Sequence, residues 1–230
     1  MRLGLALLPL TVALSGLPLP GADWINLLNG KNLDGWEVRG EGIWIVIKDG
    51  TLVGQRDSSA GLARQQWPLT RQNYQAWRDT QCWLYTVREF GEFDLRLDYW
   101  IRRPGNSGVS IRDPSRAQYG ITTPADFTRT PSKLGYEIQI NNGYPDPTPT
   151  GSIYGLAMAK TGYQFDDDWN TLDIQSRTSG IRVSLNGHPV AEHPGVPARP
   201  KTGSIGLQLH DQYTLVMFRN LRLRELTAAK

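Results

Sequence analysis

Residues 136–141 combine groups that can do chemistry with the alternating pattern of a β-strand. In Tyr136–Asn141 the side chains of Glu137, Gln139 and Asn141 fall on one face, and the two isoleucines between them fall on the other. A carboxylate followed by two amides offers a row of hydrogen-bonding groups suited to a ligand that carries many hydroxyls. The same pattern also fits the solvated outer face of a sheet. Other strands must therefore show whether this row belongs to a site.

Comparable polar rows occur on three further segments whose opposite face is apolar. In Phe93–Arg102, Gly108–Arg112 and Ser204–His210, aliphatic residues alternate with polar or charged ones. The polar faces of the four segments present Asp98, Trp100, Arg112, Glu137, Gln139, Gln208 and His210. If the four strands belong to one sheet, these side chains form a single patch. Carboxylate, amide and guanidinium groups bind vicinal hydroxyls, and an indole packs on the apolar face of a sugar ring, so the pattern favours a carbohydrate site.

The strands that must position this patch are indicated by alternation of apolar and polar residues along the chain. The predicted strands are Ile43–Lys48, Thr51–Gly54, Phe93–Arg102, Gly108–Arg112, Tyr136–Asn141, Thr171–Ser176, Ile181–Leu185, Ser204–His210 and Leu215–Arg224. Asp49-Gly50 and Asn186-Gly187 lie between such segments, and these pairs accept the positive φ angles of tight hairpins. The sequence contains no glycine-rich nucleotide loop and no alternation of strands with helices. It predicts an all-β protein, a two-sheet antiparallel jelly-roll sandwich formed by one domain over residues 23–230.

Three segments outside the strands are candidates for the rim of a site. Arg56–Gln81 is polar and carries two tryptophans, and a short helix over Thr70–Asp79 is expected within it. This segment is either a surface excursion packed on the edge of the sandwich or a lid over a site. The proline-rich segment Tyr144–Thr150 and the segment Thr161–Asp168 are further rim loops.

Composition and the N-terminus limit the partners and the location of the protein. The chain has 230 residues, a formal net charge of +3, and 25 basic residues that are scattered rather than clustered. Because nucleic-acid binding needs a basic stripe or a reading motif, that class is excluded. Arg2 followed by the apolar run Leu3–Leu14 is typical of a signal peptide, predicted over residues 1–22, and the run is too short to span a membrane. We expect an exported, soluble protein of the periplasm or extracellular space, with the lone Cys82 as a core thiol.

Short motifs follow one another along the chain in an order that resembles a known family. They are Leu27–Trp36, Trp44 with Lys48-Asp49-Gly50, Trp83–Thr86, Phe93–Tyr99, Gly105–Gly108, Tyr136–Gln139, Gly151–Gly155, Trp169–Thr171, Asn186-Gly187, Gly203–His210 and Phe218–Asn220. From about Trp24 to Leu226 the chain resembles the 3-keto-disaccharide hydrolase domain family, long known only as a domain of unknown function. The resemblance implies a concanavalin-A-like jelly roll and activity on glycosides that are oxidised at C3 of the sugar.

The chain departs from the family pattern at three places. Asp98 occupies a position where the family usually has Glu, so its carboxylate reaches one methylene less far. The usual Leu-Gln-Asp-His-Gly reads Leu-Gln-Leu-His-Asp over Leu207–Asp211, which removes an acid and a turn glycine beside His210. Arg56–Gln81 is longer than the family leads us to expect. These differences bear on substrate and activity rather than on the fold.

The implied chemistry assigns roles to the candidate residues. A ketone at C3 acidifies the C2 proton, so a base can remove it and expel the C1 substituent by elimination, after which water adds back. Such a site needs a base, an acid for the leaving oxygen, and donors to the enolate oxygen. Glu137 and His210 are the expected acid and base, in either assignment, with Asp98 as a further catalytic carboxylate. The expected substrate-binding residues are Asn106, Arg112, Gln139, Tyr154, Gln208 and Trp100.

Other functions stay open on the sequence alone. An ordinary retaining glycosidase needs two carboxyl groups roughly 5 Å apart, which Asp98 supplies to Glu137 only if their strands are adjacent. A non-catalytic lectin-like module binding a small carbohydrate, or a structural interaction domain, can use the same fold. Gly105–Gly108 is not a nucleophile elbow, so serine chemistry is disfavoured. No cofactor is certain, and a divalent metal held by Glu137 and His210 is compatible with the sequence.

Overall fold

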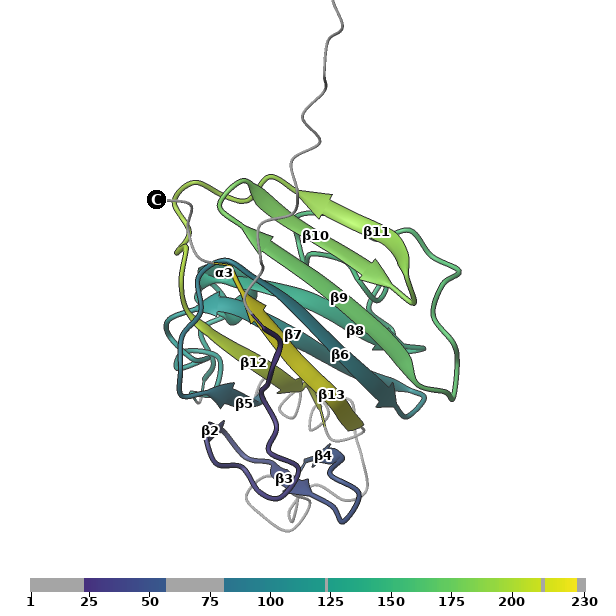
Figure 1. Cartoon of the computed structure of the whole chain (residues 1–230). Coiled ribbons are helices and arrows are strands. Elements are labelled where there is room, and N and C mark those ends of the chain that lie inside the picture. The colour runs from purple at the N-terminus through teal and green to yellow at the C-terminus, as the bar shows by residue number, and fades with distance from the viewer. Residues whose placement is uncertain (1–22, 57–80, 123, 212–213, 227–230) are drawn as a thin grey trace, which may run out of the picture.

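The computed structural model describes residues 23–56, 81–122, 124–211 and 214–226, which form two antiparallel sheets stacked face to face (Figure 1). The larger sheet contains β1 (Ile25–Asn26), β3 (Ile43–Val46), β4 (Leu52–Gln55), β6 (Phe93–Ile101), β9 (Asn170–Arg177), β10 (Gly180–Leu185), β11 (His188–His193) and β13 (Leu215–Glu225). The smaller sheet contains β2 (Trp36–Arg39), β5 (Cys82–Thr86), β7 (Gly105–Asp113), β8 (Tyr136–Asn142) and β12 (Ser204–Leu209). A short helix, α3 (Pro131–Leu134), lies in the connection between β7 and β8.

Some strands that follow each other in sequence lie in different sheets, whereas β3-β4, β7-β8 and β9-β10-β11 are neighbours within one sheet. The larger sheet runs β11-β10-β9-β6-β13-β4-β3 with β1 on β13, and the smaller runs β2-β5-β12-β7-β8. The long strands β6 and β7 follow each other in sequence, yet β6 is central in one sheet and β7 lies in the other. The predicted two-sheet antiparallel sandwich is therefore confirmed.

Every predicted strand is present, and the largest difference is at the start of β7, which begins at Gly105 rather than Gly108. The sequence patterns missed β1, β2, β5 and β11. β5 shows no alternation because both of its faces are buried: Leu84 joins the main core, whereas Trp83 and Tyr85 pack with Ala117 on the other face. Alternation of apolar and polar residues identifies only strands that have one solvent-exposed face.

Both predicted hairpin turns are confirmed. Gly50, between β3 and β4, has a φ angle of 84°. Asn186 and Gly187, between β10 and β11, have φ angles of 51° and 81°. Glycine adopts these angles at little cost and asparagine does so more readily than most residues, so the two pairs set where each hairpin turns.

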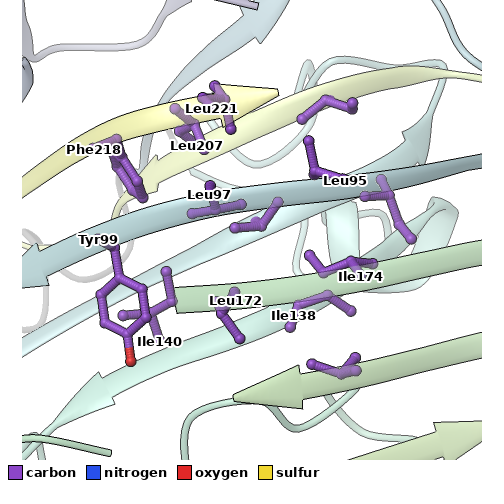
Figure 2. Close-up of a cluster of buried hydrophobic side chains, with 14 of the residues drawn as sticks. Leu95, Leu97, Tyr99, Ile138, Ile140, Leu172, Ile174, Leu207, Phe218 and Leu221 are labelled. Atoms are coloured by element: carbon purple, nitrogen blue, oxygen red, sulfur yellow. The ribbon is translucent and has the colours of Figure 1, made fainter. Parts of the chain in front are cut away.

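The apolar faces of the two sheets meet in one core (Figure 2). Its fully buried members include Leu95, Leu97 and Tyr99 from β6, Leu172 and Ile174 from β9, Phe218 from β13, Ile138 and Ile140 from β8, and Leu207 from β12. Each buried side chain of this size contributes roughly 1.5–3 kcal/mol. The core therefore fixes β8 and β12 firmly, and the residues that alternate with these side chains are directed to the outer face of the smaller sheet.

Some predictions fall outside the described residues. The signal peptide over residues 1–22 and the helix over residues 70–79 lie there, so export and the role of that segment stay predictions. Cys82 is confirmed as a core thiol, because it is fully buried and burial is the main cause that raises its pKa to about 11. Among the described residues, no helix is long and apolar enough to cross a membrane.

Candidate active site

A cavity of about 410 Å³ lies over the outer face of the smaller sheet. Its lining residues are Gln81, Asn106, Phe127, Thr130, Ser132, Lys133, Glu137, Gln139, Tyr144, Pro145, Asp146, Tyr154, Gln208 and His210. The floor comes from alternate residues of β7, β8 and β12, whose sequence neighbours point into the core. The volume lies in the range of small-molecule binding sites.

The register of the strands brings the floor residues together. β7 pairs with β8 so that Ser110 is opposite Glu137, Gly108 is opposite Gln139 and Asn106 is opposite Asn141. β12 pairs along the other side of β7 and adds Gln208 to the row. The predicted site residues that line this cavity are Glu137, His210, Asn106, Gln139, Tyr154 and Gln208.

Glu137 is the acidic group of the floor, and its side chain is almost fully buried. Burial is the main cause that raises the pKa of Glu137 to about 8, the negative charge of Asp146 adds to it, and a hydrogen bond with Gln208 acts in the opposite direction. At neutral pH this carboxyl therefore holds its proton. A neutral carboxyl inside a cavity is suited to donate a proton to a substrate atom.

Gly108 makes room for the Glu137 carboxyl. A Cβ atom at position 108 would lie 2.7 Å from Oε1 of Glu137 and 3.1 Å from its Cγ. The carboxyl therefore lies across β7 at the point where that strand has no side chain. Any larger residue at this position must displace the carboxyl.

His210 follows the end of β12 and is oriented by its neighbours. Its Nδ1 lies 3.1 Å from Oδ2 of Asp211, a fully buried carboxylate. The ring also packs edge-on against Tyr144, with centroids 5.3 Å apart. A carboxylate at Nδ1 favours the tautomer in which Nε2 carries no proton, and such a nitrogen can act as a general base.

The amides of the floor offer hydrogen-bonding groups to a ligand. The Nε2 of Gln139 donates to Oδ1 of Asn106 at 3.2 Å, which links β8 to β7. The Oε1 of Gln208 is buried and has no hydrogen-bond partner among the described residues. An unsatisfied buried carbonyl oxygen costs about 1–3 kcal/mol, so a ligand hydroxyl that donates to it would bind favourably.

One wall of the cavity is the predicted rim loop Tyr144–Thr150. The side chain of Asn141 holds this loop, because its Nδ2 donates to the carbonyls of Asp146 at 2.9 Å and Thr148 at 3.2 Å and its Oδ1 accepts from the amide of Tyr144 at 3.0 Å. The hydroxyl of Tyr154 donates to Oδ2 of Asp146 at 3.2 Å. Asn141 is therefore a support for the wall rather than part of the floor.

Several lining residues were not found by sequence reasoning. They are Gln81, Phe127, Thr130, Ser132, Lys133 and Asp146. Most belong to the connection around α3, which carries no periodic signal. Asp146 lies in a loop already expected at the rim, and its carboxyl is the one such group in Tyr144–Thr150. That feature could have identified it.

The prediction that Asp98 and Trp100 share this patch is wrong. Both lie on β6, in the larger sheet, and face away from the core on the opposite side of the sandwich. The carboxylate of Asp98 accepts hydrogen bonds from Oγ1 of Thr171 at 2.7 Å and from Nδ2 of Asn220 at 2.6 Å. Alternation correctly gave the outer face of each strand but did not give the sheet to which the strand belongs.

The placement of Arg112 in the patch is also wrong. Ile111 and Arg112 together oppose the single residue Ile205, and Arg112 has a φ angle of 56°. This β-bulge breaks the alternation, so the side chain does not continue the row formed by Asn106 and Ser110. Arg112 is only 1% exposed and does not line the cavity, and burial lowers the pKa of its guanidinium.

The side chains that the structure describes do not include a cluster typical of a metal site. No group of three or more His, Cys, Asp or Glu side chains gathers among them. Glu137 and His210 both line the cavity, so their joint use as metal ligands stays a prediction.

The two-sheet sandwich belongs to the concanavalin-A-like class of folds and carries a polar cavity on the outer face of its smaller sheet. Residues 23–224 match the 3-keto-α-glucoside-1,2-lyase-like domain, also called the 3-keto-disaccharide hydrolase domain, and the chain belongs to this family. The predicted family is therefore confirmed. A comparison with curated proteins finds no match.

Solved structures with the same fold include carbohydrate-active proteins. A candidate glycosyl hydrolase from Parabacteroides distasonis has a TM-score of 0.63 at 19% identity and covers 89% of this chain and 94% of its own. A second from the same organism has a TM-score of 0.60 at 25% identity, over 89% and 100% of the two chains. The β-glucanase of Bacillus licheniformis has a TM-score of 0.55 at 13% identity, over 90% and 99%. The family identifies a carbohydrate-active protein, and the likeness to these solved structures shows the shared fold.

Proposed function

We propose that the protein cleaves the glycosidic bond of 3-keto-glucosides by elimination, with Glu137 as the general acid and His210 as the general base. The observation that carries this proposal is the pairing, in one cavity, of a carboxyl whose pKa is raised to about 8 with an imidazole oriented by Asp211. The family name supports the substrate class.

The reaction follows from the acidity that the C3 ketone gives to the C2 proton. Nε2 of His210 takes this proton, and the electron pair of the C2–H bond moves into an enolate whose negative oxygen is at C3. The enolate then expels the oxygen at C1, the C1–O bond breaks, and Glu137 gives its proton to the leaving oxygen. The products are an alcohol and an unsaturated 3-keto sugar, and addition of water to the new double bond gives the overall hydrolysis product.

Hydrogen-bond donors around the floor support the enolate and hold the sugar. Among the described residues that line the cavity, Lys133 is the one with a permanently basic side chain. Its ammonium group can stabilise the negative enolate oxygen. The amides of Asn106 and Gln139 and the unsatisfied Oε1 of Gln208 bind ring hydroxyls. Tyr154 holds Asp146 and thereby maintains the charge that helps to keep Glu137 protonated.

An ordinary glycosidase is a second candidate, favoured by one observation. Asp146 lines the same cavity as Glu137, so the site holds the two carboxyl groups that glycosidases use. This candidate requires a charged nucleophile or base beside the protonated acid, a role that falls to Asp146.

A single assay separates the candidates. The purified protein is incubated with a 3-keto-disaccharide and with its unoxidised parent, each with and without a chelator, and release of the aglycone is measured. Release from the keto form alone supports elimination. Release from both identifies an ordinary glycosidase, and tight binding of the parent with release from neither identifies a lectin-like module.

A further inference from the structure

A second cavity of about 450 Å³ lies beside the first. Its lining residues are Asn141, Tyr144, Asp146, Pro147, Pro149, Thr150, Met158, Ala159, Lys160, Thr161, Gly162, Tyr163, Gln164 and Leu185. Tyr144 and Asp146 line both cavities. A ligand that fills the first cavity and extends past these two residues therefore enters the second.

The polar groups of Asn141, Thr150 and Gln164, which line the second cavity, are already hydrogen-bonded within the protein. The three bonds of the Asn141 amide all go to the loop Tyr144–Thr150. The Oγ1 of Thr150 accepts from the amide of Asn141 at 2.8 Å and donates to its carbonyl at 2.9 Å. The side chain of Gln164 donates to the same carbonyl at 3.0 Å and accepts from the hydroxyl of Tyr99 at 3.0 Å. These groups have little capacity left for the hydroxyls of a ligand.

This arrangement contrasts with the first cavity, where the side-chain Oε1 of Gln208 is buried and unsatisfied within the described residues. A sugar bound in the second cavity would lose hydrogen bonds to water without gaining replacements, which costs free energy. An apolar group has no such cost.

The second cavity also offers apolar surface. Pro147, Pro149 and Met158 contribute to its lining, and Met158 is 63% exposed. The ring of Tyr163 is held by stacking on His188, with centroids 4.5 Å apart. A thioether and rigid rings make favourable contacts with aromatic and aliphatic groups.

We propose that the second cavity binds the leaving group of glycosides whose sugar lies in the first, and that this group is an aryl or alkyl aglycone rather than a second sugar. The inference rests on the proposed function only for the position of the sugar. It assigns specificity to Met158 and the prolines of the loop Tyr144–Thr150, none of which takes part in the chemistry.

Binding measurements test this without relying on turnover. The dissociation constants of methyl α-glucoside, 4-nitrophenyl α-glucoside and maltose are measured by calorimetry with the unaltered protein. Their 3-keto forms are measured with the Glu137→Gln variant, which blocks the proposed reaction. We expect the nitrophenyl compound to bind at least tenfold more tightly than the methyl compound and than maltose, because its ring buries apolar surface.

Met158→Asp places a charge in the second cavity and should remove most of this tenfold difference while leaving the affinity for the methyl compound within twofold. Val87→Asp is the matched control, because Val87 is 56% exposed and lines neither cavity. It should change neither affinity. Thermal unfolding of both variants shows whether the fold is kept, and Met158→Lys repeats the test with the opposite charge.

Three results would overturn the proposal. The first is that the methyl and nitrophenyl compounds bind equally, or not at all, in both oxidation states. The second is that maltose binds more tightly than the nitrophenyl compound. The third is that Met158→Asp lowers the affinity for the methyl compound as much as it lowers the affinity for the nitrophenyl compound. Cleavage of methyl 3-keto-glucoside without an aryl preference refutes this inference and leaves the proposed function standing. Tighter binding of the aryl compound without cleavage of any keto compound supports this inference and refutes the proposed function.

Discussion

The Nδ1 of His210 lies 3.1 Å from Oδ2 of Asp211, and Asp211 is fully buried while His210 is partly exposed to the cavity. The acid that the family pattern places before the histidine is absent from this chain, where Leu209 stands. The structure shows that the acid after the histidine supplies a carboxylate to the ring. This departure from the pattern therefore keeps a carboxylate–imidazole pair beside the cavity.

Replacement of this carboxylate should slow the reaction without weakening substrate binding. In Asp211→Asn the His210 ring loses the negative partner that fixes its tautomer, so we expect kcat to fall by roughly 10²- to 10⁴-fold with KM within about threefold. The measurement is steady-state kinetics on a 3-keto-glucoside. Asp167→Asn, in an exposed loop where asparagine accepts the φ angle of 56°, is the control and should keep full activity. Unchanged kcat in Asp211→Asn would remove Asp211 from this role.

The activity should decrease in alkaline solution. Glu137 donates its proton to the leaving oxygen only while it is protonated, and burial with the nearby charge of Asp146 raises its pKa to about 8. We expect kcat/KM to fall tenfold for each pH unit above about 8. Asp146→Asn removes the negative charge that helps to raise this pKa, so the alkaline limb of the variant should move to lower pH. A limb that stays in place in Asp146→Asn would show that another group titrates.

The stability of the protein should depend on Glu137 in the same pH range. Between the ordinary carboxyl pKa of 4.5 and the raised pKa of about 8, folded Glu137 keeps a proton that the unfolded chain has released. The free energy of unfolding therefore falls as pH rises through this window. Glu137→Gln removes the penalty and should be more stable than the unaltered protein at pH 9 by up to about 5 kcal/mol, since each pKa unit corresponds to about 1.4 kcal/mol.

Urea unfolding at pH 5 and pH 9 measures this difference. Glu89→Gln is the control, because Glu89 is exposed on the surface and its replacement should change stability equally at the two pH values. A Glu137→Gln variant that gains nothing between pH 5 and pH 9 would indicate that Glu137 is already charged at neutral pH in the folded protein.

Gly108 should be required for activity although it carries no functional group. A methyl group there meets the Glu137 carboxyl at 2.7 Å, so Gly108→Ala must move the acid away from its position over β7. We expect at least a hundredfold loss of kcat, because small displacements of a catalytic group are costly. Gly91→Ala is the matched control, since a Cβ atom there would be 3.6 Å from Thr202, an ordinary contact. Full activity of Gly108→Ala would contradict the placement of the acid.

The sequence was sufficient to predict the fold and several of the residues that line the cavity, but not all of them. The alternation of apolar and polar residues and the two turn pairs, Asp49-Gly50 and Asn186-Gly187, depend only on local backbone geometry. They can therefore be recognised within a single strand or hairpin. The sheet that a strand joins depends on long-range pairing. The local pattern of Phe93–Ile101 therefore could not show that Asp98 lies in a different sheet from Glu137. The bulge at Arg112 changes the direction of the Arg112 side chain through a positive φ angle. No glycine beside Arg112 in the sequence indicates such an angle.

The wall residues were missed for a different reason. Lys133 and Phe127 reach the cavity from the connection between β7 and β8, which contains only the short helix α3, so their positions depend on tertiary packing rather than on periodicity. Glu137 shows the same limit in its electrostatics: its residue type was evident from the sequence, whereas the burial that keeps it protonated arises from Gly108, Gln208 and the loop that carries Asp146.

Asp98 tests the separation of the two sheets. Because its carboxylate bonds with Thr171 and Asn220 on the far side of the sandwich, Asp98→Ala should lower stability by about 1–2 kcal/mol and leave kcat and KM within twofold. Gln208→Ala, which removes one hydrogen-bonding side chain from the floor of the cavity, should instead raise KM about tenfold with a smaller effect on kcat. Urea unfolding and steady-state kinetics on both variants make the comparison. A large kinetic defect in a stable Asp98→Ala protein would mean that the outer face of the larger sheet takes part in the reaction.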